Sequence, residues 1–304
     1  MAHTLPSGIF AAVLLPRNAD GGLDEQALGA NLRFLLEKGI RQFALNGATG
    51  EFCRVNPAEL RQLMQAAWKC LPADASVLCG VGAASLQESL ALAQVAAEER
   101  AMALLLPMPY FFPYKQSDLE AFAGAFAEAS PLPALLYNLP QFTSGLEVDT
   151  VLRLLRTHKN LVGVKDSSGS LDIVRAITRE ALPVSRIIGN DGALAQALQE
   201  GVCDGVVSGV ACVLPEVIEA LFAVKPTDPY FQTATTLLKE FIAQIDVLPT
   251  PWGLKVIAES RSLAQPAFPL PVSEQRAEQI KGIQSWFETW LPTASAQLHP
   301  VGAR

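Results

Sequence analysis

The chain has 304 residues, of which 50% are hydrophobic and 17% are charged, and its formal net charge is −7. A composition this rich in apolar residues excludes a chain that is mainly disordered. The negative charge argues against nucleic acid or an anionic membrane as a partner, because both attract basic proteins. No apolar stretch approaches the ~20 residues of a membrane-spanning helix, and the short apolar run at 9–15 lacks the flanks of a signal peptide.

Aliphatic runs alternate along the chain with longer segments of helical spacing. The runs occupy residues 8–16, 42–47, 76–82, 101–107, 133–140, 161–168, 186–191 and 203–209. Near-continuous apolar strands are typical of a parallel sheet that is covered on its faces. Eight such units in about 225 residues fit a closed barrel better than an open sheet. We therefore predict a (β/α)8 barrel over residues 1–225.

The segments between the runs have the features of amphipathic helices. Between the first two runs, one helical stripe carries Leu28, Leu32, Leu35 and Leu36. After the third run, Ser85 is placed as an N-cap and Glu88 would complete a capping box.

From about residue 226 onward the aliphatic runs stop. Helical spacing predicts helices at 228–246, 250–262 and 273–291, and the last two are joined by the proline-rich stretch 266–271. Because this segment has no core of its own, we predict that residues 226–304 form a helical extension packed on the barrel.

In such a barrel the catalytic groups lie at the carboxyl ends of the strands. Lys165 directly ends the sixth run, and of the nine lysines in the chain only this one ends a predicted strand. Partial burial at the mouth of a barrel favours the neutral amine, which can attack a ketone to form a Schiff base. The alternative is a lysine that merely ends a strand and extends its amine to solvent.

Two further features accompany Lys165. Tyr137 lies on the neighbouring strand, where a phenol can carry protons during imine formation and carbon–carbon cleavage; it can equally be a core tyrosine with a hydrogen-bonded hydroxyl. The segment GATGE at 47–51 follows the second run, and its glycines allow backbone amides to converge on an anion. Glycine-rich turns after strands are common, so this loop alone is a weak signal.

The residues give little support for a metal site, a catalytic triad or a dinucleotide-binding site. Of the three histidines, His3 and His299 lie near the termini and only His158 is internal, so we expect neither a metal site nor a catalytic triad. The segment at 80–85 lacks the third glycine of a dinucleotide fingerprint, and no cofactor is expected. The five cysteines are scattered without a Cys-x-x-Cys spacing, which predicts free, mostly buried thiols and a cytoplasmic protein.

Four motifs together resemble the dihydrodipicolinate synthase/N-acetylneuraminate lyase family, in its order and spacing. They are GATGE at 47–51, PYFFPY at 109–114, YNLP at 137–140 and GVKDSSG at 163–169. The resemblance covers roughly residues 6–225. It implies a (β/α)8 barrel, a class I aldolase that forms a Schiff base with pyruvate or another 2-oxo acid, an aldehyde co-substrate, no metal, and usually a tetramer built from dimers.

The resemblance also implies a role for each matching residue. Lys165 would form the Schiff base, and Tyr137 would move a proton to and from the oxygen of the second substrate. Thr49 would pass protons between Tyr137 and Tyr110, the latter inserted from the adjacent subunit. Ala48 and Thr49 would bind the carboxylate of pyruvate. The remaining implied contacts are those of the imine and of substrate hydroxyls: Gly189, Val207, Ser167, Asp191 and Ser208.

The chain departs from the family pattern at three positions. Phe142 stands where dihydrodipicolinate synthases have an arginine that binds the carboxylate of the aldehyde, and a phenyl ring cannot make that contact. Gly192 replaces the acidic residue that holds the far end of sialic acid, and Ala48 replaces a hydroxyl residue. The changes at 142 and 192 favour a 2-oxo-3-deoxy sugar acid, shorter than sialic acid, as the substrate, whereas Ala48 leaves one fewer donor for the carboxylate.

Three alternatives remain open. The first is a synthase of the same family that condenses pyruvate with an aldehyde, although Phe142 argues against a carboxylate-bearing one. The second is an inactive barrel with a binding or regulatory role, against which Lys165, Tyr137, Thr49 and Tyr110 count together. The third is a metal-dependent aldolase, for which the histidines are too few.

Overall fold

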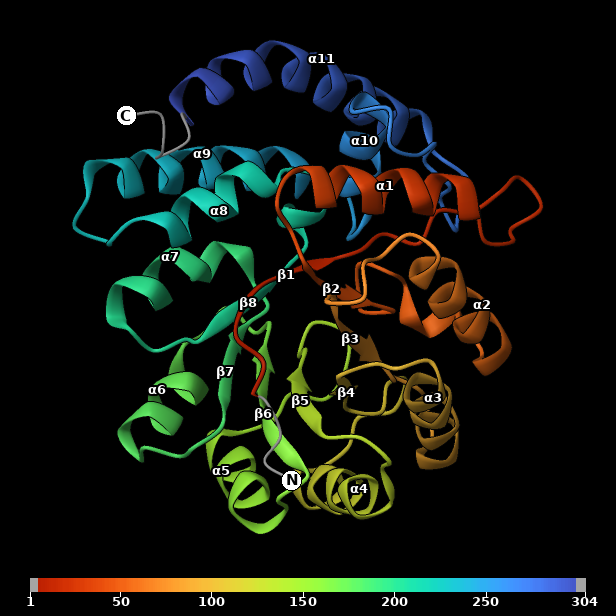
Figure 1. Cartoon of the computed structure of the whole chain (residues 1–304), viewed down its shortest axis with the longest axis vertical. Helices are drawn as coiled ribbons and strands as arrows, with labels where there is room; N and C mark the ends of the chain where they lie inside the picture. Colours follow the sequence, from red (N-terminus) through yellow and green to blue (C-terminus); the bar gives the residue numbers. More distant parts are fainter. Residues whose placement is uncertain (1–4, 299–304) are drawn as a thin grey trace.

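The computed structural model describes residues 5–298, and within that range eight parallel strands close into a barrel in chain order (Figure 1). The strands are β1 Gly8–Ala12, β2 Gln42–Leu45, β3 Ser76–Gly80, β4 Ala103–Pro107, β5 Ala134–Asn138, β6 Leu161–Asp166, β7 Ser185–Ile188 and β8 Gly205–Ser208. Each overlaps one of the predicted aliphatic runs. The predicted (β/α)8 barrel is therefore confirmed.

A helix follows each strand on the outside of the barrel (Figure 1). These helices are α1 Glu25–Glu37, α2 Pro57–Trp68, α3 Leu86–Glu98, α4 Gln116–Ala129, α5 Val148–Thr157, α6 Asp172–Arg179, α7 Asp191–Glu200 and α8 Pro215–Ala223. Single turns of 3-10 helix, η1 Phe52–Arg54 and η2 Val210–Cys212, follow β2 and β8.

Local chemistry explains where these helices begin and which face they bury. The Ser85 hydroxyl accepts a hydrogen bond from the Glu88 amide and donates one to the Glu88 carboxylate, so the predicted N-cap is confirmed. The carboxylate thus bonds the Ser85 hydroxyl rather than the Ser85 amide of a full capping box. In α1 the predicted stripe faces the barrel, with Leu28, Leu32 and Leu35 fully buried.

Alternate side chains of the strands form two apolar layers. The inner layer fills the barrel with residues such as Phe10, Leu105 and Leu135, whereas the outer layer packs against the helices. Near the carboxyl ends the pattern changes, because Tyr137 and Lys165 occupy paired positions on β5 and β6. The register thus brings the two predicted catalytic residues side by side.

After α8 the chain forms α9 Pro229–Ile245, α10 Trp252–Ser260 and α11 Glu274–Gln297. Helix α9 packs on α7 and α8, and α11 lies across α9 and α10 at one side of the barrel (Figure 1). Phe241 of α9 anchors this packing, since its ring centroid lies 5.9–6.3 Å from those of Trp286, Phe287 and Trp290 in α11.

Helix α11 is longer than predicted. A helix ending at 291, before Pro292, was expected from the sequence, but α11 continues through this proline to Gln297. Proline removes one backbone donor and disfavours a helix interior. Here tertiary packing outweighs that preference, because Ala294, one turn from Leu291, is 1% exposed within the core.

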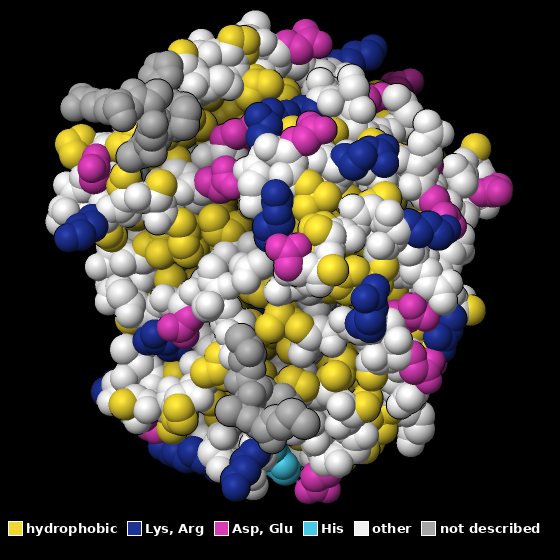
Figure 2. All heavy atoms as spheres, viewed as in Figure 1, with side chains coloured by type: hydrophobic (Ala, Val, Ile, Leu, Met, Phe, Trp, Pro, Cys, Tyr) yellow, Lys and Arg dark blue, Asp and Glu magenta, His cyan; other side chains and the backbone are white. Residues whose placement is uncertain are grey.

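Other features of the described chain bear on the sequence predictions. No helix within residues 5–298 is long and apolar enough to cross a membrane. Figure 2 shows basic and acidic side chains interspersed over one face rather than gathered by sign. His3 and His299 lie outside the described residues. The cysteines are all unpaired, with Cys79 and Cys212 buried, Cys70 and Cys203 half-buried, and Cys53 exposed.

Candidate active site

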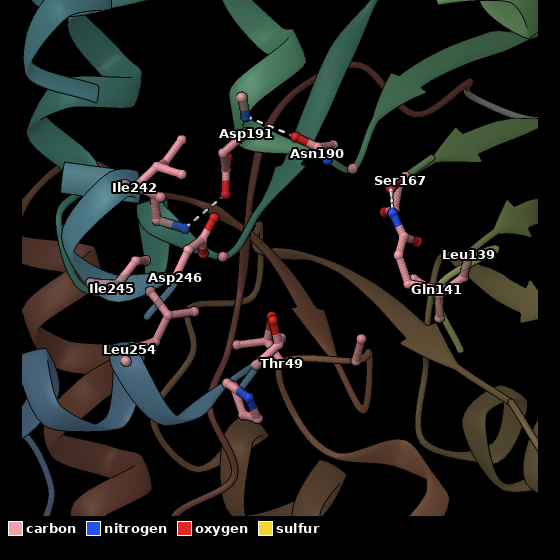
Figure 3. A pocket seen from close by; sticks show the side chains of 18 of the residues that line it. Thr49, Leu139, Gln141, Ser167, Asn190, Asp191, Ile242, Ile245, Asp246 and Leu254 are labelled. Carbon is pink, nitrogen blue, oxygen red and sulfur yellow. Dashed lines mark hydrogen bonds between the residues drawn. The ribbon is translucent and has the colours of Figure 1, made fainter. Parts of the chain in front are cut away.

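A cavity of about 230 Å³ opens at the carboxyl ends of the strands (Figure 3). Most of its wall comes from strand ends and the loops that follow them, including Thr49, Tyr137, Lys165 and Gly189. The rest comes from the segment 242–254, at the end of α9 and the start of α10. The C-terminal extension therefore completes the site.

Lys165 and Tyr137 are in direct contact within this cavity. The Lys165 Nζ atom lies 3.9 Å from the centroid of the Tyr137 ring. The two residues are 3% and 2% exposed, so the amine and the phenol are nearly removed from bulk water. The structure thus holds together an amine and a phenol, the two groups that the predicted Schiff-base chemistry would use, largely shielded from bulk water.

The Lys165 side chain fits in its position because Gly189 has no side chain. A Cβ atom at Gly189 would lie 2.1 Å from the Ser167 Oγ atom and 2.8 Å from the Lys165 Cε atom. Ser167 is itself 6% exposed, and its hydroxyl has no hydrogen-bond partner among the described residues. That hydroxyl is therefore available to a ligand beside the amine.

We expect Gly189→Ala to lower turnover by roughly 10²-fold, the loss that an ångström of misplacement at a reacting group can bring. The added methyl group would displace Lys165 or Ser167, because neither contact distance is tolerable. Gly192→Ala is the matched control, since it lines the same cavity and a Cβ atom there meets only the Asn190 side chain at 3.1 Å. Steady-state kinetics of both variants, with melting temperatures, test this. Equal activities would show that Gly189 does not position Lys165.

The loop 47–51 brings Ala48 and Thr49 to the cavity. Its shape depends on left-handed backbone at both ends, with φ of 55° at Asn46 and 54° at Glu51. The Asn46 side chain holds the loop by donating to the Gly80 carbonyl at 2.8 Å. Within residues 5–298 the amides of Ala48 and Thr49 have no hydrogen-bond partner. They remain free for an anion such as a carboxylate.

A buried ion pair ties this loop to the C-terminal extension. The Lys255 Nζ atom of α10 lies 2.6 Å from the Glu51 Oε2 atom, and it also donates to the Ala267 carbonyl at 2.6 Å. Lys255 and Glu51 are 5% and 7% exposed. Burial lowers the pKa of Lys255, and the Glu51 carboxylate opposes that change. The loop that carries Thr49 and the helix that carries Leu254 therefore form one unit behind the cavity.

The loop after β5 is held against β6. The Asn138 side chain donates to the Asp166 carboxylate at 3.0 Å and accepts from the Leu146 amide at 3.0 Å. Gln141 donates from its side chain to the Ser167 carbonyl at 2.9 Å. Burial raises the pKa of Asp166, although the hydrogen bonds it accepts act in the opposite direction. These contacts place the loop, and Phe142 on it, at the edge of the cavity.

Asp191 begins α7 and lies in the cavity wall. Its Oδ2 atom accepts from the Val210 amide at 3.1 Å. Burial raises the pKa of Asp191, while the Ser208 hydroxyl, the Val210 amide and the charge of Lys165 lower it. Asp191 is thus a carboxylate that the protein supports from behind while one side faces the cavity.

Nine of the eleven residues predicted for the site line the cavity. They are Ala48, Thr49, Tyr137, Phe142, Lys165, Ser167, Gly189, Asp191 and Val207. Ser208 does not, because it is fully buried and its hydroxyl accepts from the Ala211 amide at 2.8 Å. It supports η2 and also lowers the pKa of Asp191, and a contact between Ser208 and a substrate stays a prediction.

Tyr110 also lies away from the cavity of its own chain. Its ring packs edge-on against Phe52, with centroids 5.8 Å apart, and burial raises its pKa. The neighbouring Phe111 is 85% exposed and has a φ of +83°. The part that Tyr110 would play from an adjacent subunit stays a prediction.

The segment 242–254 is what the sequence analysis missed. Its cavity-lining members include Ile242, Asp246 and Leu254. No strand end marks these residues in the sequence, and they meet the barrel only through helix packing. A carboxylate at the end of an amphipathic helix gives no signal of its own.

Comparisons with known proteins agree with this arrangement. The model of the dihydrodipicolinate synthetase family matches residues 5–286. A probable 2-dehydro-3-deoxy-D-pentonate aldolase of Escherichia coli (strain K12) is 30% identical over 285 residues, which are 90% of this chain and 94% of that protein. A 4-hydroxy-tetrahydrodipicolinate synthase of Methanopyrus kandleri is 32% identical over 219 residues, 71% of this chain and 72% of that protein.

The fold also matches that of solved structures. The structure of the 4-hydroxy-tetrahydrodipicolinate synthase of Methylacidiphilum fumariolicum SolV has a TM-score of 0.85 at 26% identity, covering 96% of this chain and 99% of that one. The resemblance drawn from the four motifs is thereby confirmed. The family match spans the barrel and most of the C-terminal extension, and it includes the cavity residues Lys165 and Tyr137. This chain therefore belongs to the dihydrodipicolinate synthetase family.

Proposed function

We propose that the protein is a class I aldolase that forms a Schiff base between Lys165 and pyruvate or another 2-oxo acid. It would break or form a carbon–carbon bond in a 2-oxo-3-deoxy sugar acid. The observation that carries this proposal is the buried Lys165 amine, 3.9 Å from the Tyr137 ring centroid, in a cavity bordered by the free amides of Ala48 and Thr49.

The proposed reaction follows from these positions. The carboxylate of the substrate binds at the amides of the loop 47–51, which brings its keto carbon to Lys165. The neutral amine adds to that carbon, and loss of water leaves a protonated imine. The Tyr137 hydroxyl takes the proton of the C4 hydroxyl as it passes its own proton to Thr49, which passes a proton on to water. The C3–C4 bond then breaks, its electrons pass into the imine to give an enamine, and the aldehyde leaves.

The second half returns the enzyme to its starting state. The Tyr137 hydroxyl donates a proton to C3 of the enamine and regains one through Thr49, which restores the imine. Water then hydrolyses the imine to release pyruvate and the free amine. Condensation of pyruvate with an aldehyde is the same sequence in reverse.

The wall of the cavity supports a hydroxylated substrate without a second carboxylate. Phe142 is 54% exposed at the cavity edge, where it can pack on a carbon chain. Two arginines of this region, Arg17 and Arg54, do not line the cavity and are paired with acids elsewhere. The Arg17 Nη1 atom lies 2.5 Å from the Glu59 carboxylate, and Arg54 faces Glu51 at 3.4 Å.

The size of the cavity also favours a short acid. Its volume of about 230 Å³ lies below the roughly 300–1,000 Å³ of pockets for drug-sized ligands. The Escherichia coli relative is described by its name as acting on a 2-dehydro-3-deoxy-D-pentonate, a five-carbon acid of this class.

We expect the highest kcat/KM for cleavage of five- or six-carbon 2-oxo-3-deoxy sugar acids. Condensation of pyruvate with aspartate semialdehyde is expected to be slower, and cleavage of sialic acid slowest. Among the described residues the cavity wall has no cation besides Lys165 to pair with the aldehyde's carboxylate, and the cavity is small for sialic acid. All three specificity constants, measured side by side on one preparation, test this. If aspartate semialdehyde proves the best substrate, the reaction is a synthase reaction and Phe142 does not determine specificity.

We also infer that the protein is a homo-oligomer, a dimer or a tetramer. Phe111 and Phe112 are 85% and 61% exposed, and they stack edge-to-face in the loop after β4. Paired exposed aromatic rings are typical of a surface that another protein covers. Light scattering at micromolar concentration measures the mass directly.

A further inference from the structure

The charges in the cavity wall are unevenly distributed. Among the described residues that line the cavity, Lys165 is the only cation, and Asp191 and Asp246 are the only anions. Figure 3 places both aspartates on one side, opposite Gln141 and Ser167. Asp191 belongs to the barrel, whereas Asp246 follows α9 in the C-terminal extension.

The position of Asp246 is unfavourable for helix stability. It is the C-cap of α9, where the carbonyl end of a helix favours a cation over a carboxylate. Its carboxylate makes no hydrogen bond or ion pair within the part of the chain described here. Burial raises the pKa of Asp246, which is the direction expected of a carboxyl group that has lost part of its hydration. The stability of α9 therefore does not explain why an acid occupies position 246.

The charge balance of the bound state suggests a reason. In the proposed reaction, the positive charge of the Lys165 imine is matched by the carboxylate of pyruvate. Asp191 and Asp246 are then left facing the space that the aldehyde occupies, with no cation in the wall to balance a further negative charge. Hydroxyl groups can donate hydrogen bonds to these carboxylates, whereas a second carboxylate would be repelled by both.

We propose that Asp246 is a specificity-determining residue for the aldehyde: it accepts hydrogen bonds from the hydroxyls of a neutral polyhydroxy aldehyde and excludes aldehydes that carry a carboxylate. This inference rests on the function proposed above. It assigns part of the substrate choice to the C-terminal extension rather than to the barrel loops alone.

The test compares two aldehydes in the direction of condensation with pyruvate. Glyceraldehyde is neutral and hydroxylated, and succinate semialdehyde carries a carboxylate. We expect Asp246→Asn to shift the ratio of their kcat/KM values toward succinate semialdehyde by roughly tenfold, the worth of one hydrogen bond to a charged group. Asp246→Lys should shift it further, and added salt should reduce both shifts because Asp246 is partly exposed.

Two controls separate specificity from folding and from pyruvate binding. Glu278→Gln removes an exposed acid of α11 outside the cavity, and it should leave the ratio unchanged. Borohydride trapping with pyruvate alone should proceed in Asp246→Asn at the wild-type rate. The melting temperature of Asp246→Asn should be equal to or above that of the wild type, because the substitution removes an unfavourable charge from the end of α9.

The outcomes also distinguish this inference from the proposed function. If the wild type condenses pyruvate with glyceraldehyde but both Asp246 variants keep the wild-type ratio, Asp246 does not select the aldehyde. A lowered melting temperature with equal losses for both aldehydes would mean a purely structural role and would overturn the inference. If the wild type neither condenses any aldehyde nor is trapped by borohydride with pyruvate, the proposed function itself is wrong.

Discussion

Replacement of Lys165 by arginine is expected to lower aldolase activity by roughly four orders of magnitude or more, as loss of a covalent nucleophile does in other enzymes. Arginine keeps a positive charge and a long side chain, but its guanidinium stays protonated and cannot attack a ketone. Lys165 is the only lysine among the described residues that line the cavity, so no second lysine is present there to replace it.

Borohydride trapping tests the predicted role of Lys165 by a second measurement. Wild-type protein treated with pyruvate and borohydride should be inactivated irreversibly, and mass spectrometry should locate the reduced pyruvyl group on Lys165. Lys165→Arg should take up no label. Lys225→Arg, an exposed lysine after α8, should be labelled like the wild type. A label on a different lysine, or none in the wild type, would contradict the Schiff-base assignment.

Tyr137→Phe is expected to lower kcat by about 10²–10⁴-fold, the range that general acid–base groups supply. The substitution keeps the ring, which is 2% exposed and packs under the Lys165 amine, so the cavity should keep its shape. Only the hydroxyl, the proposed proton-transfer group, is lost. The apparent affinity for pyruvate should therefore change much less than turnover, because the proposed function assigns its carboxylate to the amides of the loop 47–51.

Steady-state kinetics and the melting temperature of the variant measure both parts of this prediction. Tyr114→Phe is the control, since Tyr114 is half-buried in the loop after β4 and does not line the cavity. Near-normal turnover in Tyr137→Phe would reduce Tyr137 to a packing residue at the barrel rim. A large rise in the pyruvate KM with unchanged kcat would instead assign it to carboxylate binding.

The barrel and its principal residues could be predicted because their signals are local. Strands that are buried on both faces appear as unbroken aliphatic runs, and helices appear as stripes three and four residues apart. A parallel barrel then places every strand end on one face. That rule sufficed to predict that Lys165 and Tyr137 share one site, and both line the cavity although they are 28 positions apart in the chain.

Local signals failed where packing between distant elements decides the outcome. The end of α11 was predicted too early, because the cost of Pro292 is visible in the sequence whereas the burial of Ala294 is not. The family resemblance implies that Ser208 contacts the substrate. The structure shows its hydroxyl accepting a hydrogen bond from the Ala211 amide, a partner that no local pattern in the sequence specifies.

The sequence by itself determined the fold, the alternation of its elements and the lysine–tyrosine pair, because periodicity and strand-end position are properties of short segments. Only the tertiary structure decided that the C-terminal helices complete the cavity wall, that Lys255 ties them to the loop 47–51, and that Asp246 lines the cavity. These contacts join residues about 200 positions apart, as Lys255 and Glu51 are. Such pairs form only after the barrel has closed and the extension has packed on it, so no pattern within one segment of the chain can reveal them.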